Sequence, residues 1–353
     1  MLGAGFSNSW DARYPTGADL FNLADDDWTA WSPLLAEFLS MIGFPGERLK
    51  LDRPLFLDIV YQVGMLRKYP PIRNRFVDDY CLNVMERELR YLVYRKFNDN
   101  APPPRLHNGQ FRLDGTSTRE QEAILSFFSA LMHPSCEQMP ATSDYAPQVS
   151  FVTTNYDFVI EALVDTSNQH TPHASRRLYR GFTPLAWCGD DALTAAQLRP
   201  TGNLLKINGG FDLILAQHGL EIDYRERDAD VARRDPPQIM LPSRAQDYDQ
   251  PYFQALFPKA VRLLQESRIV VLVGYGFPEE DALLRLLLRQ FAEAPTDGRQ
   301  RVLYYVDLAD ERTQLERARR AFPHVGRDGG LVVKPFQGSF GHWCDEVLAC
   351  VSV

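Results

Sequence analysis

Amide and carboxylate side chains stand directly after apolar runs of this sequence, where they could act on a bound ligand. Asn155 and Asp157 follow a strand-like run that ends at Thr153, and Asn208 follows a run that ends at Ile207. A strand that stops at such residues presents them at the carboxyl edge of a sheet, where open α/β sheets bind ligands. Asn and Asp also end strands simply as turn formers, so the pattern needs support from neighbouring motifs.

Glycine-containing turns supply that support. Gly3 and Gly5 open the chain, and Gly274 and Gly276 follow a third apolar run. Two glycines in one tight turn allow backbone N–H groups to approach a pyrophosphate. Asn8 occupies the last glycine position of a G-x-G-x-x-G fingerprint, so the dehydrogenase pattern is not met. Taken singly, the first turn is equally consistent with an ordinary glycine turn.

Four segments, taken in order, resemble the sirtuin-like (Sir2-like) family, in the branch of bacterial anti-phage NAD-hydrolysing proteins. They are Gly3–Ser7, Thr153–Asp157, Lys206–Gly210 and Val270–Phe277. The resemblance implies a domain that cleaves NAD to nicotinamide and ADP-ribose. Sirtuin deacetylases usually carry a four-cysteine zinc module, and the five cysteines here lack that spacing. We therefore expect NAD as substrate or ligand, no metal and no deacetylase activity.

The same resemblance assigns two asparagines to the reaction. Asn155 matches the amide beside the nicotinamide ribose, where a neutral group can orient water or a ribose hydroxyl next to an oxocarbenium-like transition state. Asn208 stands where the family has the general-base histidine of a K-L-H-G motif. General-base catalysis contributes on the order of 10²–10⁴ in rate, so hydrolysis is predicted to be weak rather than absent, because an oxocarbenium ion accepts weak nucleophiles. His107, Asp212 and His218 are predicted surface residues, so none is expected to replace it.

The residues expected to contact NAD lie in these turns and strand ends. They are Gly3, Ala4, Gly5, Phe6, Ser7, Thr154, Asp157, Gly209, Gly274, Tyr275 and Asp307. Asp157 has two interpretations, because it either supports Asn155 or caps the helix that follows. Asp281 likewise either opens a helix beside the nucleotide or is a plain helix cap. Asp307 is expected to hold the adenosine ribose hydroxyls, as acidic residues at strand ends do.

Short apolar runs alternate with helical patterns over the second half of the chain. The strand candidates are 149–153, 203–207, 238–241, 269–274, 302–307 and 331–336, with helices at 254–266 and 279–294 among them. This alternation predicts an α/β fold, a Rossmann-like doubly wound parallel sheet with a helical insertion module. Only Met1 and Leu2 precede the first glycine turn, so the first strand is expected to be lost, which would weaken the central sheet, or else to be very short. Residues 98–118 are predicted to be a long loop, and 219–237 an exposed charged flap.

The domain boundaries follow from the change in periodicity. Apolar residues recur at helical three and four spacing from about residue 20 to 135. Residues 1–20 and 145–353 are therefore predicted to form the Rossmann-like sirtuin-type NAD-binding domain. Residues 21–144 are predicted to form the inserted helical module.

Composition narrows the classes of partner. The net charge of −8 argues against a surface dominated by nucleic-acid binding, and 45% hydrophobic residues suffice for a full core. No apolar run approaches the roughly 20 residues of a membrane span, and no secretory pattern is present, so a cytoplasmic location without direct membrane contact is predicted. The resemblance implies a homo-oligomer, with a translocase-type ATPase or an Argonaute-like protein as partner.

Two functions remain open from the sequence. The first is an NAD-hydrolysing effector of bacterial anti-phage defence. The second is a catalytically impaired NAD- or ADP-ribose-binding subunit, or a scaffold, of a defence complex. Asn208 favours the second, because an amide cannot accept a proton near neutral pH, and so does the expected loss of the first strand.

Overall fold

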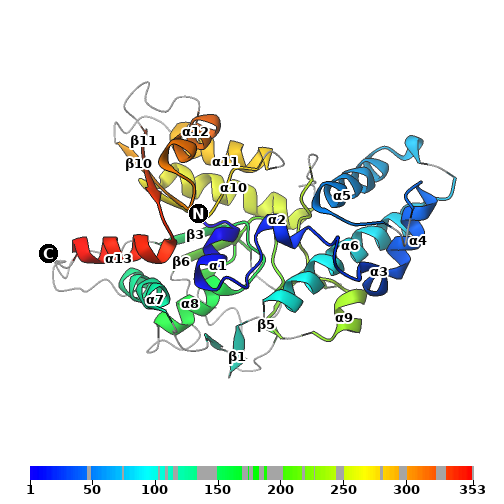
Figure 1. Cartoon of the computed structure of the whole chain (residues 1–353), viewed down its shortest axis with the longest axis horizontal. Helices are drawn as coiled ribbons and strands as arrows, with labels where there is room; N and C mark the ends of the chain where they lie inside the picture. Colours follow the sequence, from blue (N-terminus) through cyan, green and yellow to red (C-terminus); the bar gives the residue numbers. More distant parts are fainter. Residues whose placement is uncertain are drawn as a thin grey trace.

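A sheet of parallel strands forms the centre of the computed structural model (Figure 1). In spatial order its strands are β11 (Leu331–Gln337), β10 (Arg301–Asp307), β9 (Ile269–Val273), the segment Met1–Gly3, β3 (Ser150–Thr153), β6 (Gly202–Lys206) and β4 (Leu178–Tyr179). Every pairing within this sheet is parallel. The structure describes residues 1–45, 49–73, 75–101, 104–107, 110–113, 118–132, 149–168, 174, 178–182, 187–188, 202–216, 219–225, 227–243, 250–278, 281–293, 300–322 and 331–351.

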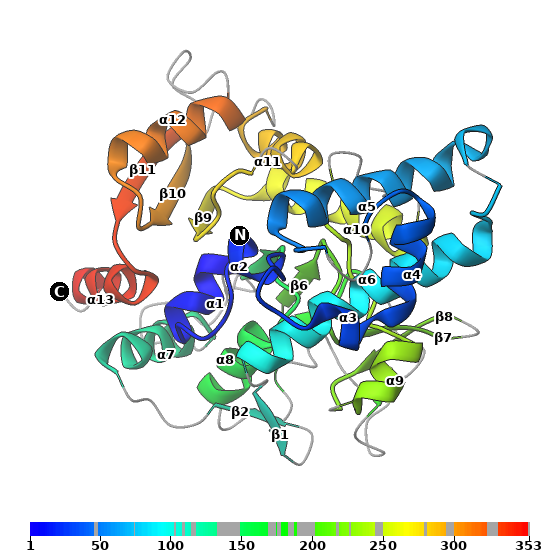
Figure 2. The same cartoon turned by 45° about the vertical axis from the view of Figure 1, so that its right-hand side comes forward.

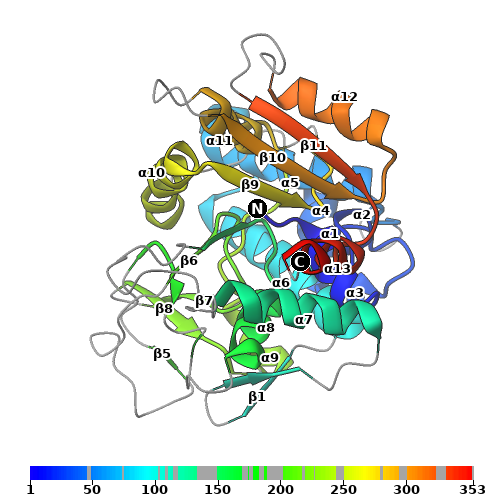
Figure 3. The same ribbon diagram turned by 90° about the vertical axis from the view of Figure 1, so that its left-hand side faces the viewer.

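The first residues of the chain occupy the middle of the sheet. Leu2 forms parallel bridges to Thr153 on one side and to Val273 on the other. Its N–H donates to the Val152 carbonyl at 2.9 Å, and the Gly3 N–H donates to the Val273 carbonyl at 2.9 Å. Figure 3 shows the N-terminus between β9 and β6. A very short first strand, one of the two expectations from the sequence, thus lies where the strand order changes direction.

Alternate residues of the strands face two separate cores, as a doubly wound sheet requires. Phe151 and Leu204 face one core, whereas Val152 and Leu205 face the other. The first core includes α1 (Ala4–Trp10), α7 (Arg119–Met132), α8 (Val159–Ser167) and α13 (Phe340–Val351). The second includes α10 (Pro251–Glu266), α11 (Ala282–Glu293) and α12 (Glu311–Ala321). The predicted fold class is confirmed.

Helices α2 (Gly17–Leu20), α3 (Trp28–Trp31), α4 (Pro33–Met41), α5 (Arg53–Lys68) and α6 (Asp79–Asn100) form the helical part at the right of Figure 1, with a short 3-10 turn at Pro70–Ile72. The rings of Tyr94 and Phe97 on α6 lie 5.4 and 4.8 Å from the ring of Phe211, which follows β6. Through this aromatic contact, α6 packs against the segment that follows β6. Helix α7 instead lies beside α13 (Figure 3).

Three secondary-structure predictions were wrong. Residues 238–241 form only one isolated bridge, Gly209 to Ile239, because their backbone groups bond to the turn after β6. The predicted loop 98–118 contains a hairpin of β1 (Arg105–His107) and β2 (Gln110–Arg112). The predicted flap contains β8 (Gly219–Asp223) and α9 (Ala229–Arg234). β8 pairs with β7 (Leu213–Ala216) and β5 (Trp187–Cys188), so local charge was a poor guide to long-range strand pairing.

Candidate active site

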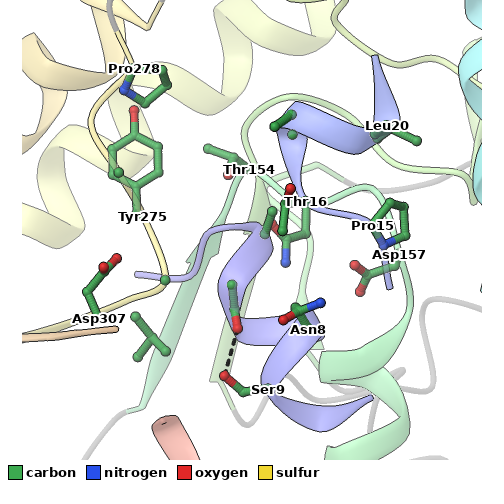
Figure 4. Close-up of a pocket in the computed structure, with 18 of the residues that line it drawn as sticks. Asn8, Ser9, Pro15, Thr16, Leu20, Thr154, Asp157, Tyr275, Pro278 and Asp307 are labelled. Carbon is green, nitrogen blue, oxygen red and sulfur yellow. Dashed lines mark hydrogen bonds between the residues drawn. The ribbon is translucent and has the colours of Figure 1, made fainter. Parts of the chain in front are cut away.

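A cavity of about 660 Å³ lies at the carboxyl ends of β3, β9 and β10, beside the short first strand. In Figure 4, Tyr275, Pro278 and Asp307 line one side, and Thr16, Thr154 and other residues near α1 line the other. Its volume lies within the roughly 300–1,000 Å³ of small-molecule sites. Parallel strands all end at the same edge, so the fold brings these sequence-distant segments together.

Nine of the predicted site residues line this cavity. They are Ala4, Gly5, Thr154, Asn155, Asp157, Asn208, Gly274, Tyr275 and Asp307. The other four, Gly3, Phe6, Ser7 and Gly209, lie behind it rather than among its lining residues. Phe6 is placed in the core instead, because its ring packs 5.4 Å from that of Phe340.

Asn155 is held by a chain of buried hydrogen bonds. Its side-chain N–H₂ donates to the Gly3 carbonyl at 3.0 Å and to Ser7 Oγ at 2.8 Å. Ser7 Oγ in turn donates to Asp157 Oδ2 at 2.7 Å. Both amide protons of Asn155 are thus used, and its carbonyl oxygen remains as the acceptor of the side chain. Ser7 therefore orients Asn155 without lining the cavity.

Asp157 performs both of the roles considered for it. It fixes the direction of the Ser7 hydroxyl, and its Oδ1 accepts the N–H of Val159 at 3.0 Å where α8 begins. Burial raises the pKa of Asp157, whereas the hydrogen bond from Ser7 and the bond from Val159 act in the opposite direction. Both carboxylate oxygens are occupied, so this residue is placed to position other groups.

A buried ion cluster secures the strand that leads to Asn208. Lys206 Nζ lies 2.7 Å from Glu161 Oε1 and donates to the Asp157 carbonyl at 2.6 Å. Arg180 Nη1 lies 2.6 Å from Asp212 Oδ2, and both side chains are buried. Removing one partner from such a cluster leaves an uncompensated buried charge, so the cluster resists rearrangement.

Asn208 lies in the cavity wall, and the glycine after it allows the backbone to pack closely against residues 238–239. Gly209 has φ +81°, and a Cβ there would lie 2.1 Å from the Gln238 carbonyl oxygen. The Asn208 carbonyl accepts the N–H of Met240 at 2.8 Å, which fixes the backbone of this residue. Gly209 is thus required by packing in this structure.

The other glycines press two turns against each other. Gly274 has φ +57°, and a Cβ there would lie 2.5 Å from the backbone of Gly5. A Cβ on Gly3 would lie 2.6 Å from the Gly274 carbonyl oxygen, which accepts the Gly5 N–H at 3.1 Å. The Gly3 and Gly5 N–H groups are therefore engaged within the protein. A phosphate at this turn would need other donors or would have to displace the Gly5 bond.

The comparison with protein families gives one match. The model of the SIR2-like domain matches residues 149–324. The chain carries a SIR2-like domain. No match was found among curated proteins or among solved structures. The matched region runs from β3 to α12 and includes Asn155, Asn208 and Asp307, so it contains much of the cavity wall. SIR2-like domains bind NAD and are typically NAD-dependent enzymes, which points to a sirtuin-like, NAD-related enzyme.

Two arginines that sequence reasoning missed also line the cavity of the SIR2-like domain. Arg53 comes from the start of α5, outside the matched region, and Arg317 comes from α12. Arg317 Nη1 lies 3.5 Å from Asp307 Oδ1, and the same carboxylate oxygen accepts the Ala309 N–H at 2.9 Å. Both arginines suit an anionic ligand. Nothing in their local sequence separates them from ordinary surface arginines of a helix.

The structure also shows the positions of two further carboxylates, Asp281 and Asp212. Asp281, just before α11, accepts the Tyr275 hydroxyl at 2.8 Å and lines the cavity. Asp212 was predicted to be a surface residue, which was wrong, because it is buried against Arg180.

The general base and the metal were both predicted to be missing. His107 is exposed, as predicted, and His218 lies outside the described residues. No histidine is among the described residues that line the cavity. No group of three or more His, Cys, Asp or Glu side chains in the described ranges could hold a metal ion. Nor does any helix in these ranges combine the length and apolar character needed to cross a bilayer.

Proposed function

We propose that this protein hydrolyses the nicotinamide–ribose bond of NAD and releases nicotinamide and ADP-ribose. The orientation of Asn155 carries the proposal. Its two amide protons are held by Gly3 and Ser7, which leaves a carbonyl oxygen as the acceptor of a neutral side chain in the cavity wall. A SIR2-like domain around that cavity supplies the expected ligand.

The reaction needs little from the protein beyond orientation. The C–N bond breaks with its electron pair passing to nicotinamide, and water attacks the resulting oxocarbenium-like carbon while it loses one proton. The carbonyl oxygen of Asn155 can accept a hydrogen bond from that water or from a ribose hydroxyl. A neutral acceptor cannot form a covalent adduct as readily as a carboxylate would.

Charged lining residues support binding of the rest of NAD. Asp307 ends β10 at the edge of the cavity, where a carboxylate can accept both hydroxyls of the adenosine ribose. Arg53 and Arg317 can neutralise the pyrophosphate from the two sides of the site. The helical part therefore contributes to the same ligand as the sheet.

Asn208 makes slow turnover part of the proposal. The bases among the described lining residues are carboxylates, and both oxygens of Asp157 already accept hydrogen bonds. Loss of a general base lowers the rate by about 10²–10⁴, and bulk water can still remove the proton. The same observation favours a second candidate function, a subunit that binds NAD or ADP-ribose without turnover.

The biological setting is proposed from the resemblance to anti-phage proteins. In this proposal the protein is a cytoplasmic defence effector that depletes NAD once it assembles as a homo-oligomer. A translocase-type ATPase or an Argonaute-like protein would supply the signal for activation.

The test is nicotinamide release from NAD by the purified protein, alone and together with the product of an adjacent gene. We expect Asn155→Ala to abolish release. Asn203→Ala is the matched control, because Asn203 donates to Ser150 Oγ at 2.9 Å and does not line the cavity. NAD that binds in a calorimeter but is never cleaved would replace the hydrolase with the binding subunit. Equal release by both variants would show that Asn155 is not at the reaction centre.

A further inference from the structure

A second cavity, of about 690 Å³, lies away from the NAD cavity, between the helical part and the sheet. Helices α5 and α6 form one wall, and β7, β8 and the start of α10 form the other. Figure 2 shows these elements gathered at one end of the molecule. The two cavities share no lining residue.

One wall of this second cavity is rich in arginine, although the whole chain carries a net charge of −8. Arg67 and Arg90 both pair with Glu86, with 2.6 Å between Arg67 Nη2 and Glu86 Oε2. Arg87 and Arg234 add two more guanidinium groups. Among the described residues, the solvent-shielded Nε of Arg87 has no hydrogen-bond partner. The described lining therefore holds four arginines against two carboxylates, Glu86 and Asp235, and so carries an excess of positive charge.

The first turn of α10, in the wall opposite α5 and α6, adds further positive potential to the cavity. The helix is 16 residues long, begins at Pro251 and has no acidic residue in its first turn. Its N-cap residue, Gln250, makes no side-chain capping bond, and both residues line the second cavity. The positive end of a helix dipole favours an anion at such a place.

The opposite wall is apolar and partly aromatic. The rings of Phe182 and Tyr252 meet edge to face at 5.4 Å, and both residues line the second cavity. Leu215 lines it as well and is 59% exposed, unusually high for a leucine in a strand. An aromatic and apolar wall opposite arginines matches a ligand that has both a flat ring system and several negative charges.

We propose that this second cavity binds a nucleotide that carries two or more phosphates. Arginine recognises phosphate oxygens with paired, charge-assisted hydrogen bonds, and Arg87 is placed to offer them. Phe182 and Leu215 provide a surface for the base, since stacking on aromatic side chains is tolerant of base identity. The cavity volume is that of a small-molecule site.

Arg90 is unsuitable for a test of this cavity, because it also bonds to Gln238, which contacts the turn that follows β6. Arg90 Nη1 donates to Gln238 Oε1 at 3.1 Å, and the Gln238 carbonyl accepts the Gly210 N–H at 3.2 Å. Substitution of Arg90 would therefore disturb the turn that holds Asn208. Arg87 and Leu215 have no such bond to the NAD cavity and are the positions to change.

The experiment is calorimetric titration of the full chain with ATP. We expect ATP to bind and Arg87→Gln to weaken binding at least tenfold. Arg95→Gln, which alters a half-buried arginine farther along α6 that does not line this cavity, is expected to leave ATP affinity unchanged. Leu215→Asp should weaken binding similarly, whereas Ile269→Asp, at a residue that is 60% exposed elsewhere, should not. Leu215→Asp decides the outcome if Arg87→Gln does not fold.

Two further arms identify the ligand class and the cavity. Tripolyphosphate is expected to bind at least tenfold more weakly than ATP, because it lacks the base. Arg317→Gln, in the NAD cavity, is expected to leave ATP affinity unchanged. No ATP binding, ATP binding that ignores both cavity variants, loss of binding in Arg317→Gln, or equal affinity for tripolyphosphate would each overturn the proposal. None of these readouts depends on NAD hydrolysis.

Discussion

In this site, the donor and acceptor of each hydrogen bond determine how the Asn155 side chain is oriented. Asp157 accepts from Ser7, Ser7 accepts from Asn155, and the order of donors sets which end of the Asn155 amide remains for the ligand. The carbonyl and N–H₂ ends of an asparagine side chain have nearly the same shape, so packing alone does not decide which end faces the ligand. Ser7, which lies between Asn155 and Asp157 in this chain of bonds, therefore sets the orientation of the asparagine amide.

Removal of that serine hydroxyl tests the chain of bonds. We expect Ser7→Ala to lower kcat for nicotinamide release about 10- to 100-fold, with a loss of unfolding free energy of about 1–3 kcal/mol, because a buried hydrogen bond to a carboxylate is lost. Ser267→Ala is the matched control, since its hydroxyl donates to the Leu263 carbonyl at 2.6 Å and it does not line the cavity. A Ser7→Ala protein that turns over NAD like the control would rule out this orienting role.

The missing base can be supplied at Asn208. We expect Asn208→His to raise the rate of nicotinamide release by at least tenfold and at most by the roughly 10²–10⁴ that a general base provides. The rate should also increase with pH as the imidazole loses its proton, because only the neutral form accepts one. Asn208→Gln keeps an amide and should show neither effect. No gain in Asn208→His would mean that proton removal does not limit the rate.

The buried carboxyl of Asp157 links folding to pH. Burial raises its pKa above the ordinary value of 3.8, so the folded chain holds this proton more tightly than the unfolded chain. Its contribution to stability is therefore full below pH 3.8 and declines as the pH rises through the folded-state pKa. Asp157→Asn has no such proton. We expect the free energy of unfolding of the variant, minus that of the wild type, to increase from pH 4 to pH 7 in urea titrations. A constant difference would contradict the raised pKa.

At the scale of secondary-structure elements, the start of α1 packs directly against the turn after β9, and glycines make this close contact possible. Gly274→Ala would combine φ +57° with a Cβ only 2.5 Å from the Gly5 backbone. We expect a loss of about 2–4 kcal/mol in unfolding free energy, from left-handed strain and overpacking. Gly276→Ala is the control in the same turn, because a Cβ there meets nothing within 4 Å. Equal stability of the two variants would show that the turns can separate.

At the scale of the whole molecule, the helical part and the sheet line one cavity together. Arg53 of α5 lies in its wall along with residues at the ends of β3, β9 and β10. We expect Arg53→Gln to raise KM for NAD about 10-fold or more with little change in kcat, because a charge-assisted hydrogen bond to a phosphate contributes to binding and not to bond cleavage. If the protein binds NAD without turnover, Kd takes the place of KM. Lys50→Gln, at an exposed residue just before α5, is the control. Unchanged NAD affinity in Arg53→Gln would exclude Arg53 from the binding of NAD.

Local patterns in the sequence determined the α/β class and five strands of the central sheet, β3, β6, β9, β10 and β11. They also determined which polar residues gather at one edge, because the side-chain period of a strand and the polar residue after it are properties of neighbouring positions. Asn155, Asn208 and Asp307 could be found in this way. The boundaries of the helical module at 21–144 remain a prediction, and α7, which was assigned to it, lies against α13.

Only the tertiary structure decided how these residues are held. Ser7 and Asp157 are 150 positions apart, so no spacing in the sequence could show that one orients the other through a hydrogen bond. Arg53, Arg317 and Asp212 have unremarkable neighbours in the chain, yet the fold places both arginines in the cavity wall and buries Asp212 beside Arg180. Local patterns fix which side chains leave a strand or helix, whereas burial and charge pairing depend on which elements meet in space.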